Sequence, residues 1–292
     1  MPATLVDEKV VSPYDELMAY EYLYAKEGSS RSRISKLLSM YGGRPTSAVV
    51  SIEGMLPDAS KHEEVRHYVE DHIGNFSVLV DGTPQFPVRL NAEKSPLPVF
   101  YYRGDIGLLD SRCISVVGTR HPSARGTKAA QRISRSLVEN NFTVVVGLAA
   151  GIDTDAARAA LGCSNGNVIG VIGTPIDQYY PKQNHDLQEK VATDYLLISQ
   201  VPIYRYDHQP FKTKRYYFPE RNITMAAIAE ATVIVEAGET SGTRIQAKAC
   251  MDQHKKLILL PQVVEQTTWA KKFVDMGAVV AESVTDVMRA IR

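Results

Sequence analysis

The stretch SVVGTRHPSARG, residues Ser115–Gly126, decides the class of fold. It begins as a short apolar run with the composition of a buried strand, ends that run at Gly118, and passes into a helical pattern after Gly126. A strand that leads through a glycine-containing loop into a helix is the unit of parallel α/β proteins, and such a loop can hold an anion. The loop matches neither the dinucleotide fingerprint G-x-G-x-x-G nor a Walker A loop, so this pattern alone leaves the anion open.

The same alternation continues from residue 111 to the C-terminus. Short runs rich in Val and Ile are separated by helical patterns, among them residues 125–140, 184–193 and 243–253. Continuous apolar strands are expected where both faces of a sheet are covered. The pattern predicts an α/β fold with a doubly wound, mostly parallel sheet across residues 111–292. The expected strands are RCISVVG, FTVVVGL, NVIGVIG, YLLIS, ATVIVEA and KLILLP.

Residues 1–80 are predicted to form a smaller, mostly helical N-terminal domain. Ser12 offers a cap for the helical stretch DELMAYEYLYAKEG, and a second helical stretch, RSRISKLLSMYGG, ends at a glycine pair. A short strand, FSVLV, precedes a turn at Asp81-Gly82. Prolines within residues 81–110 favour an extended strap that joins this domain to the core.

Composition excludes several classes of protein. Of 292 residues, 44% are hydrophobic and 23% charged, as in a globular protein with a core. Lys+Arg and Asp+Glu both number 33, so a nucleic acid or membrane partner would have to be recognised by a local patch. The three cysteines are far apart and share no metal-binding spacing with the histidines, so we expect no metal and no cofactor. The N-terminal stretch MPATLVDEKV lacks the apolar region of a leader, and no run approaches membrane-spanning length, so we expect a soluble cytoplasmic protein with no membrane partner.

Glycines follow four of the first five core strands, at the sheet edge where doubly wound proteins bind ligands. Glycine lets the backbone approach a ligand closely, and the helix N-termini that follow favour anions. One such loop could be an ordinary turn, whereas several at one edge favour an anionic ligand. We therefore predict that Arg120, Arg221 and Ser241–Thr243 face one common pocket at this edge.

Cations and aromatic rings alternate in IYRYDHQPFKTKRYYFPERN, residues Ile203–Asn222. Cations for phosphates and rings for bases are the components of single-strand recognition. The alternative is a loop whose rings pack on the sheet while its Lys and Arg side chains stay solvated. For the segment as a whole we favour recognition of a single strand. For each individual tyrosine, stacking on a base and packing on the sheet both stay open.

Catalytic motifs are missing from the sequence. It contains neither G-x-S-x-G nor H-E-x-x-H, and no Cys–His pairing is suggested. Asp153 and Asp155 stand near a helix start, where capping and the helix dipole explain them. Glu236 ends a strand and could bind a ribose hydroxyl or the amides of a loop. We expect a protein that is not an enzyme.

Six blocks follow one another along the chain: SVVGTRHPSARG, VVVGLAAGIDTDAARAAL, GVIGTPIDQYYPKQNHDL, LISQVP, YYFPERNITMAAIAEATVIVEAGETSGTRIQAKA and KLILLPQ. In this order they resemble the DprA (Smf) family of DNA-processing proteins. The likeness covers about residues 80–262, and the upstream DGTPQFPVRL…SPLPVFYYRGDIGLLD also resembles the segment before that family's core.

The resemblance implies an extended Rossmann-like domain of the SLOG superfamily. It also implies binding of single-stranded DNA, self-association as a homodimer, and transfer of DNA to a RecA-type recombinase in natural transformation. Carried over by position, the pocket would include Gly118, Thr119, Arg120, Ser123, Gly126, Gly147, Gly151, Lys182, Arg221, Asn222, Ser241 and Gly242. Phe218, from the aromatic segment, and Thr243 complete the residues expected to bind DNA or phosphate.

Several positions depart from the family pattern and keep other functions open. Val146 stands where a Ser is usual, Ala157 where a His is usual, and Ile223 where a second Arg is usual. One alternative is a sensor of the SLOG type that binds a nucleotide signal, for example in phage defence. A nucleotide N-glycoside hydrolase is less favoured, because Gln246 stands where the catalytic Glu of such enzymes would be and a neutral amide is no carboxylate base.

Overall fold

A computed structural model describes residues 11–54, 58–74, 76–92 and 97–292. The first ten residues of the expected N-terminal domain lie outside this description. The fold is built on one nine-stranded sheet with strand order β1-β2-β6-β5-β4-β3-β7-β8-β9. The strands are β1 (Ser77–Val80), β2 (Val99–Gly104), β3 (Cys113–Val117), β4 (Thr143–Val146), β5 (Val168–Ile172), β6 (Leu196–Ser199), β7 (Ala231–Ile234), β8 (Lys256–Leu259) and β9 (Val279–Val280).

The strands from β3 to β9 pair in parallel, which confirms the predicted doubly wound, mostly parallel α/β class. Ile114 of β3, for example, lies opposite Val144 of β4 on one side and Ala231 of β7 on the other. Because all these strands run in one direction, their carboxyl ends meet at a single edge of the sheet. The loops that the sequence predicts to bind a ligand therefore lie together at this edge.

The segment predicted to be a strap contributes a strand to the same sheet. Within residues 81–110, β2 pairs antiparallel with β6. The strand β1, which comes just before this segment, pairs antiparallel with β2 at the edge of the sheet. The β2 sequence VFYYRG has the aromatic and β-branched residues that suit a strand, and Pro98 stands just before it. The division of the chain at residues 80 and 110 stays a prediction.

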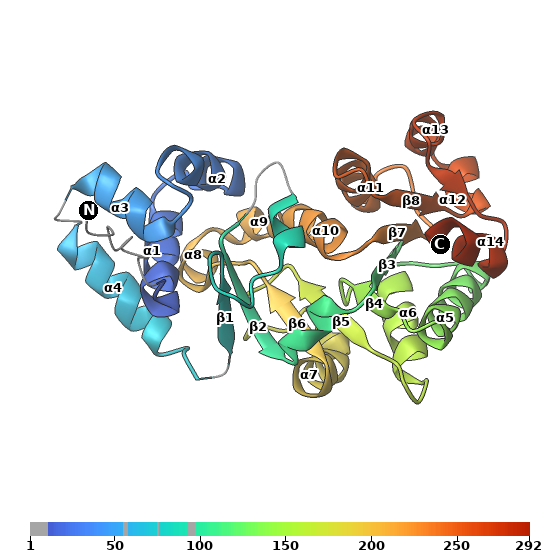
Figure 1. Cartoon of the computed structure of the whole chain (residues 1–292), viewed down its shortest axis with the longest axis horizontal. Helices are drawn as coiled ribbons and strands as arrows, with labels where there is room; N and C mark the ends of the chain where they lie inside the picture. The colour runs from blue at the N-terminus through green and yellow to red at the C-terminus, as the bar shows by residue number, and fades with distance from the viewer. Residues whose placement is uncertain (1–10, 55–57, 75, 93–96) are drawn as a thin grey trace, which may run out of the picture.

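Helices cover both faces of this sheet (Figure 1). On one face, α5 and α6 pack against β3 and β4, and α7 packs against β5 and β6; on the other, α10 and α11 pack on the sheet. The helices are α1 (Pro13–Ala25), α2 (Arg31–Met40), α3 (Pro45–Glu53), α4 (Ala59–Glu70), α5 (Ala124–Glu139), α6 (Ile152–Leu161), α7 (His185–Asp194), α8 (Ile203–His208), α9 (Phe211–Lys214), α10 (Tyr217–Ile228), α11 (Thr243–Asp252), α12 (Pro261–Gln266), α13 (Thr268–Asp275) and α14 (Val284–Ile291), with the short 3-10 helices η1 (Val88–Ala92), η2 (Ile106–Asp110) and η3 (Lys182–Asn184).

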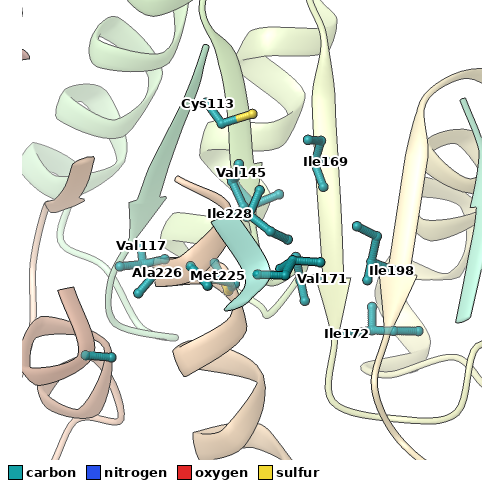
Figure 2. Packing of buried hydrophobic residues seen from close by; sticks show 14 of the residues in the cluster. Cys113, Val117, Val145, Ile169, Val171, Ile172, Ile198, Met225, Ala226 and Ile228 are labelled. Atoms are coloured by element: carbon teal, nitrogen blue, oxygen red, sulfur yellow. The ribbon is translucent and has the colours of Figure 1, made fainter. Parts of the chain in front are cut away.

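The core lies between the sheet and these helices. Figure 2 shows Val145, Ile169 and Val171 of the central strands near Met225 and Ile228 of α10, all of them buried. Every residue of β3, β4 and β5 is buried, which explains why the sequence shows continuous apolar runs and no alternation.

The front of the chain is helical, as predicted, and holds two helices that the sequence analysis did not identify. The Ser12 side chain accepts a hydrogen bond from the Asp15 amide at the start of α1, and Ser30 caps α2 in the same way. The missed helices, α3 and α4, carry ordinary start signals: Pro45 in the first turn of α3, and Asp58 as the cap of α4. No helix in the described part of the chain is both long enough and apolar enough to span a membrane.

A buried carboxylate joins α1 to the sheet. Glu21 of α1 is 0% exposed and accepts hydrogen bonds from the amides of Ile203, at 2.7 Å, and Tyr204, at 3.1 Å, where α8 begins. The Tyr101 hydroxyl of β2 also donates to Glu21. Burial raises the pKa of Glu21 to about 7, although these three donors oppose the shift.

This shift predicts that Glu21 contributes to the pH dependence of the stability. Because the folded state holds the proton more tightly, the stabilisation is complete below the ordinary pKa of 4.5 and is lost as the pH rises through about 7. We expect the free energy of unfolding to fall by about 3 kcal/mol from this group between about pH 5 and about pH 8. Urea unfolding of the protein and of Glu21→Gln at both pH values measures the difference; an equal fall in the two proteins would contradict the prediction.

Candidate functional site

A cavity of about 550 Å³ opens at the carboxyl edge of the sheet. It is bordered by the loops after β3, β4 and β7 and by the first turns of α10 and α11. The structure therefore confirms that Arg120, Arg221 and Ser241–Thr243 face one common pocket. The predicted site residues that line it are Gly118, Thr119, Arg120, Phe218, Arg221, Asn222, Ser241, Gly242 and Thr243.

Five further predicted residues are not among those that line the cavity: Ser123, Gly126, Gly147, Gly151 and Lys182. The Ser123 hydroxyl caps α5 by accepting from the Gly126 amide at 3.0 Å, and it donates to Glu236 at 2.8 Å. Gly151 is the cap residue of α6. Lys182 is exposed on η3. These residues shape or flank the cavity, and their role in binding stays a prediction.

Two of these glycines are required by close packing. A Cβ atom on Gly126 would lie 1.9 Å from Oε2 of Glu236, and one on Gly147 would lie 1.7 Å from Nη1 of Arg221. Both neighbours are buried side chains with little room to move. These glycines therefore lie where the side chains of Glu236 and Arg221 pass close to the backbone, and neither glycine is among the residues that line the cavity.

Arg221 provides a buried positive charge at the back of the cavity. It is 5% exposed, and its Nη1 donates to the Val171 carbonyl at 2.8 Å, while its Nε has no partner among the described residues. Burial lowers the pKa of Arg221 to about 10, and the nearby Asp153 carboxylate opposes that shift. The guanidinium therefore stays charged at neutral pH and keeps an unused donor.

Asp153 is the single acid among the described residues that line the cavity. It is buried and accepts a hydrogen bond from the Gly147 amide at 3.0 Å. Burial raises the pKa of Asp153, and Arg221 opposes this. Its surroundings thus place it beside a buried arginine and in a hydrogen bond with a loop amide.

The mouth of the cavity combines a cation with aromatic rings. The Arg120 guanidinium lies 5.8 Å from the centroid of the Phe218 ring, and the centroid of the Tyr180 ring lies 5.1 Å from that of Phe218. Arg120 is exposed and has no ion pair in the part of the chain that the structure describes. Arg215 and His121, which the sequence analysis did not select, also line the cavity. The signal for Arg215 was present in its aromatic and basic segment.

The segment Ile203–Asn222 divides into two kinds of residue. Tyr204, Tyr206 and Tyr217 are buried, and Tyr217 packs 5.7 Å from Tyr206 between ring centroids. Burial raises the pKa of Tyr217 well above its ordinary value. Phe218, the next residue, lines the cavity. The expectation of recognition by the whole segment is thus too broad, because most of its tyrosines belong to the core.

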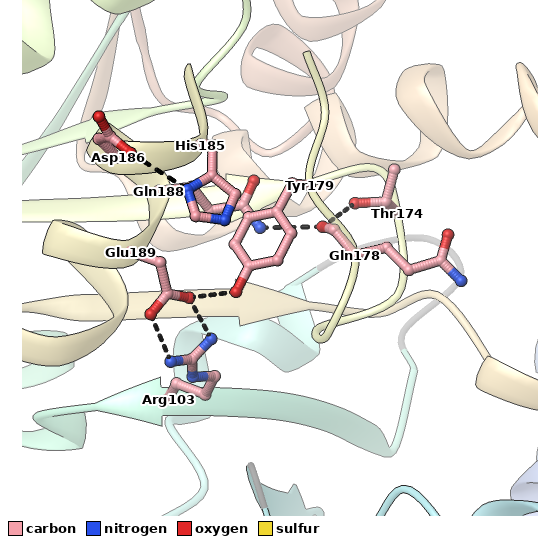
Figure 3. Close-up of polar contacts among 8 residues, drawn as sticks. All are labelled: Arg103, Thr174, Gln178, Tyr179, His185, Asp186, Gln188 and Glu189. Carbon is pink, nitrogen blue, oxygen red and sulfur yellow. Dashed lines mark hydrogen bonds and ion pairs between the residues drawn. The ribbon is translucent and has the colours of Figure 1, made fainter. Parts of the chain in front are cut away.

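A polar network holds the loop between β5 and α7, which carries Tyr180 and Lys182 (Figure 3). Glu189 accepts two hydrogen bonds from Arg103, at 2.7 and 3.1 Å, and one from the Tyr179 hydroxyl at 2.5 Å. The paired guanidinium holds the pKa of Glu189 below its ordinary value. Anchored in this way, the loop presents Tyr180 to the cavity.

The turn at residues 241–243 is held against α10. The Asn222 side-chain amide donates to the Gly242 carbonyl at 3.0 Å, and the Thr243 hydroxyl lies 2.9 Å from that of Ser241. Two neighbouring loops are joined because the Thr119 amide donates to the Glu236 carbonyl at 2.7 Å. The cavity wall is therefore preformed by contacts within the chain.

Gln246 is buried and its side-chain amide donates to the Ser115 hydroxyl at 2.8 Å. No group of three or more His, Cys, Asp and Glu side chains in the described ranges could hold a metal ion. The arrangement can bind an anion through arginines and stack a flat group on Phe218.

Comparisons with known proteins agree on one family. The chain is 36% identical over 199 residues to Protein Smf of Synechocystis sp., covering 66% of this chain and 48% of that protein. It is 34% identical over 187 residues to DNA processing protein DprA of Streptococcus pneumoniae, covering 64% of this chain and 62% of that one. The chain thus spans about half to three fifths of the length of these curated relatives.

Solved structures of the same family have the same fold. The crystal structure of DprA from S. pneumoniae superposes with a TM-score of 0.76 at 25% identity, covering 96% of this chain and 98% of that chain. DprA from Helicobacter pylori, whose structure is described as showing a unique single-stranded DNA binding mode, gives a TM-score of 0.63 at 25% identity and covers 74% of this chain and 95% of that one. Residues 77–292, which include the whole cavity, match the family of DNA recombination-mediator protein A. The chain therefore belongs to the DNA recombination-mediator protein A family, the DprA (Smf) proteins.

Proposed function

We propose that this protein binds single-stranded DNA in the cavity at the carboxyl edge of its sheet, without catalysing a reaction. The observation that carries the proposal is the gathering of Arg120, Arg215 and Arg221 with Phe218 around one cavity that has a single acid among its described lining residues. A polyanion with flat bases needs both cations and an open ring. The relative from H. pylori, which is described as a single-stranded DNA binder, supports the same ligand.

Each residue of the cavity would bind the part of the strand that suits its chemistry. Arg221, buried and with a free Nε donor, would bind one phosphate deep in the cavity, and Arg120 would bind a second at its mouth. Phe218 would stack on a base, and the turn at residues 241–243 would offer amides and hydroxyls to a phosphate. Lys182, exposed outside the cavity, would contact the strand after it leaves.

We further propose that the protein acts in the cytoplasm as a homodimer and passes the strand to a RecA-type recombinase in DNA uptake and recombination. An apolar surface supports self-association: Ile245 and Met276 are 38% and 61% exposed beside a cavity of about 730 Å³ between α11 and α13. Light scattering over a range of protein concentrations tests the dimer, and strand-exchange assays with purified recombinase test the transfer.

A nucleotide sensor is the second candidate. A cavity of about 550 Å³ is large enough to enclose a nucleotide, and its arginines would serve one as well as a polymer. A nucleotide hydrolase has less support, because Gln246 is a neutral amide that is already bonded to Ser115.

Arg120→Ala is expected to weaken oligonucleotide binding and to reduce its salt dependence. Each phosphate neutralised on a single strand contributes about 0.7 to the slope of log affinity against log salt, so the slope should flatten by about 0.7. Fluorescence anisotropy with an unstructured oligonucleotide, titrated at several salt concentrations, measures both effects.

Arg112→Ala is the matched control, because Arg112 is exposed and paired with Glu230 near the start of β3, at the opposite edge of the sheet. This variant should bind like the unchanged protein. Competition with mononucleotides separates the two candidate functions. Tight binding of a mononucleotide with none of any oligonucleotide would reject the DNA proposal and favour the sensor.

A further inference from the structure

A row of four cations lies along one face of α5. Arg125, Lys128, Arg132 and Arg135 are spaced by three, four and three residues, which places them on one side of a helix. All four are exposed, and none has an ion pair or hydrogen bond through its side chain in the described part of the chain. The row extends over about 15 Å at the helical rise of 1.5 Å per residue. Like charges at this spacing repel each other, so they destabilise the helix unless a ligand compensates them.

The first three of these cations line a second cavity, of about 530 Å³. Its opposite wall is formed by residues 260–262, which follow β8, and residues 282–284, which follow β9. Because these strands are parallel to β3, this cavity lies at the same edge of the sheet as the first. Figure 1 shows α5 beside α14, whose first residue, Val284, belongs to that wall.

One short loop separates the two cavities. Arg120 and His121 line the first, and Ala124 and Arg125 line the second. The loop is held in place because Ser123 donates to the buried Glu236 through its hydroxyl. A chain leaving the first cavity past Arg120 therefore meets Arg125 next, and then the rest of the row.

The acids near the row reduce its charge but are fewer than its four cations. Glu139, at the end of α5, is exposed and stands four residues after Arg135 on the same face of the helix. Glu282 is the exposed carboxylate in the wall of the second cavity. Asp286 accepts from Ser283 at 2.8 Å and pairs with Arg289 at 3.2 Å, and Asp155 accepts from the Thr127 hydroxyl at 2.8 Å. The face thus keeps an excess of positive charge, which suits a polyanion.

We propose that the α5 face formed by Arg125, Lys128, Arg132 and Arg135 is a second phosphate-binding track, which extends the path of a single strand bound in the first cavity. This rests on the proposed function and adds the path that one end of the strand takes when it leaves the first cavity. The track has cations but no exposed ring, so it contacts phosphates and does not read bases. A short oligonucleotide fills the first cavity only, whereas a long one also covers α5.

The test compares oligonucleotides of two lengths, roughly 5 and roughly 20 nucleotides, bound to the triple variant Lys128→Gln, Arg132→Gln, Arg135→Gln. We expect unchanged affinity for the short one. For the long one we expect affinity lower by up to about 100-fold at about 0.1 M salt, with the salt slope reduced by about 2, as three lost phosphate contacts require. The thermal unfolding temperature should not fall, because all three side chains are exposed and their removal relieves the repulsion between like charges.

The control removes the same charge elsewhere, as Lys36→Gln, Lys190→Gln, Lys271→Gln, three exposed helical lysines. The proposal would be overturned if the α5 variant bound the long oligonucleotide as tightly as the unchanged protein does. It would also be overturned if the control variant lost as much affinity for the long oligonucleotide as the α5 variant. Binding of polyglutamate that depends on α5, with long-strand binding unaffected, would also overturn it and assign the face to an acidic protein. If the unchanged protein binds neither length, the function proposed for the first cavity fails, which is a separate result.

Discussion

Replacing Arg221 with methionine is expected to abolish oligonucleotide binding and to lower the free energy of unfolding by about 3–5 kcal/mol. The buried Asp153 carboxylate would lose the cation that compensates it, and the Val171 carbonyl would lose its donor. Both costs arise because the site is buried, where an unpaired charge is not solvated. Chemical denaturation measures the stability, and anisotropy at a temperature where the variant is folded measures binding.

A double variant separates the two roles of Arg221. Asp153→Asn combined with Arg221→Met removes the orphaned charge, and the asparagine oxygen can still accept from the Gly147 amide. We expect the pair to recover much of the lost stability but none of the binding. If the double variant bound DNA normally, Arg221 would be a structural residue only.

Alanine substitutions of the adjacent residues Tyr217 and Phe218 are expected to differ: the first should mainly lower stability, and the second should mainly weaken DNA binding. Tyr217 is 8% exposed and packs on Tyr206 in the core, so Tyr217→Ala should lower the free energy of unfolding by about 3–5 kcal/mol. The folded fraction of this variant should bind single-stranded DNA with the salt slope unchanged. Thermal or urea unfolding, followed by binding at low temperature, checks both statements.

Phe218→Ala should instead weaken binding by about 1–3 kcal/mol, the contribution of one stacked base, with a smaller loss of stability. The salt slope should not change, because the ring carries no charge. Phe218→Tyr keeps the ring and should restore affinity, which makes it the matched control. A Phe218→Ala protein that unfolds as easily as Tyr217→Ala but binds normally would show that this ring belongs to the core.

The sequence by itself determined the class of fold and the edge at which the site lies. A strand that is covered on both faces is apolar along its length. The strands β3, β4 and β5 could therefore be predicted from continuous runs rich in Val and Ile. Glycines after these strands marked the carboxyl edge, because parallel strands bring their ends together. The common pocket of Arg120, Arg221 and Ser241–Thr243 follows from that rule and was confirmed.

Only the tertiary structure decided what each side chain at that edge does. Adjacent helical residues point in directions about 100° apart, so nothing local tells which of Tyr217 and Phe218 meets the core and which meets the cavity. The same holds for Ser123, whose partner Glu236 is more than a hundred positions away in the chain, and for β2, which pairs with the distant β6. These are long-range contacts, and their partners are chosen by packing of the whole chain, which no local pattern records.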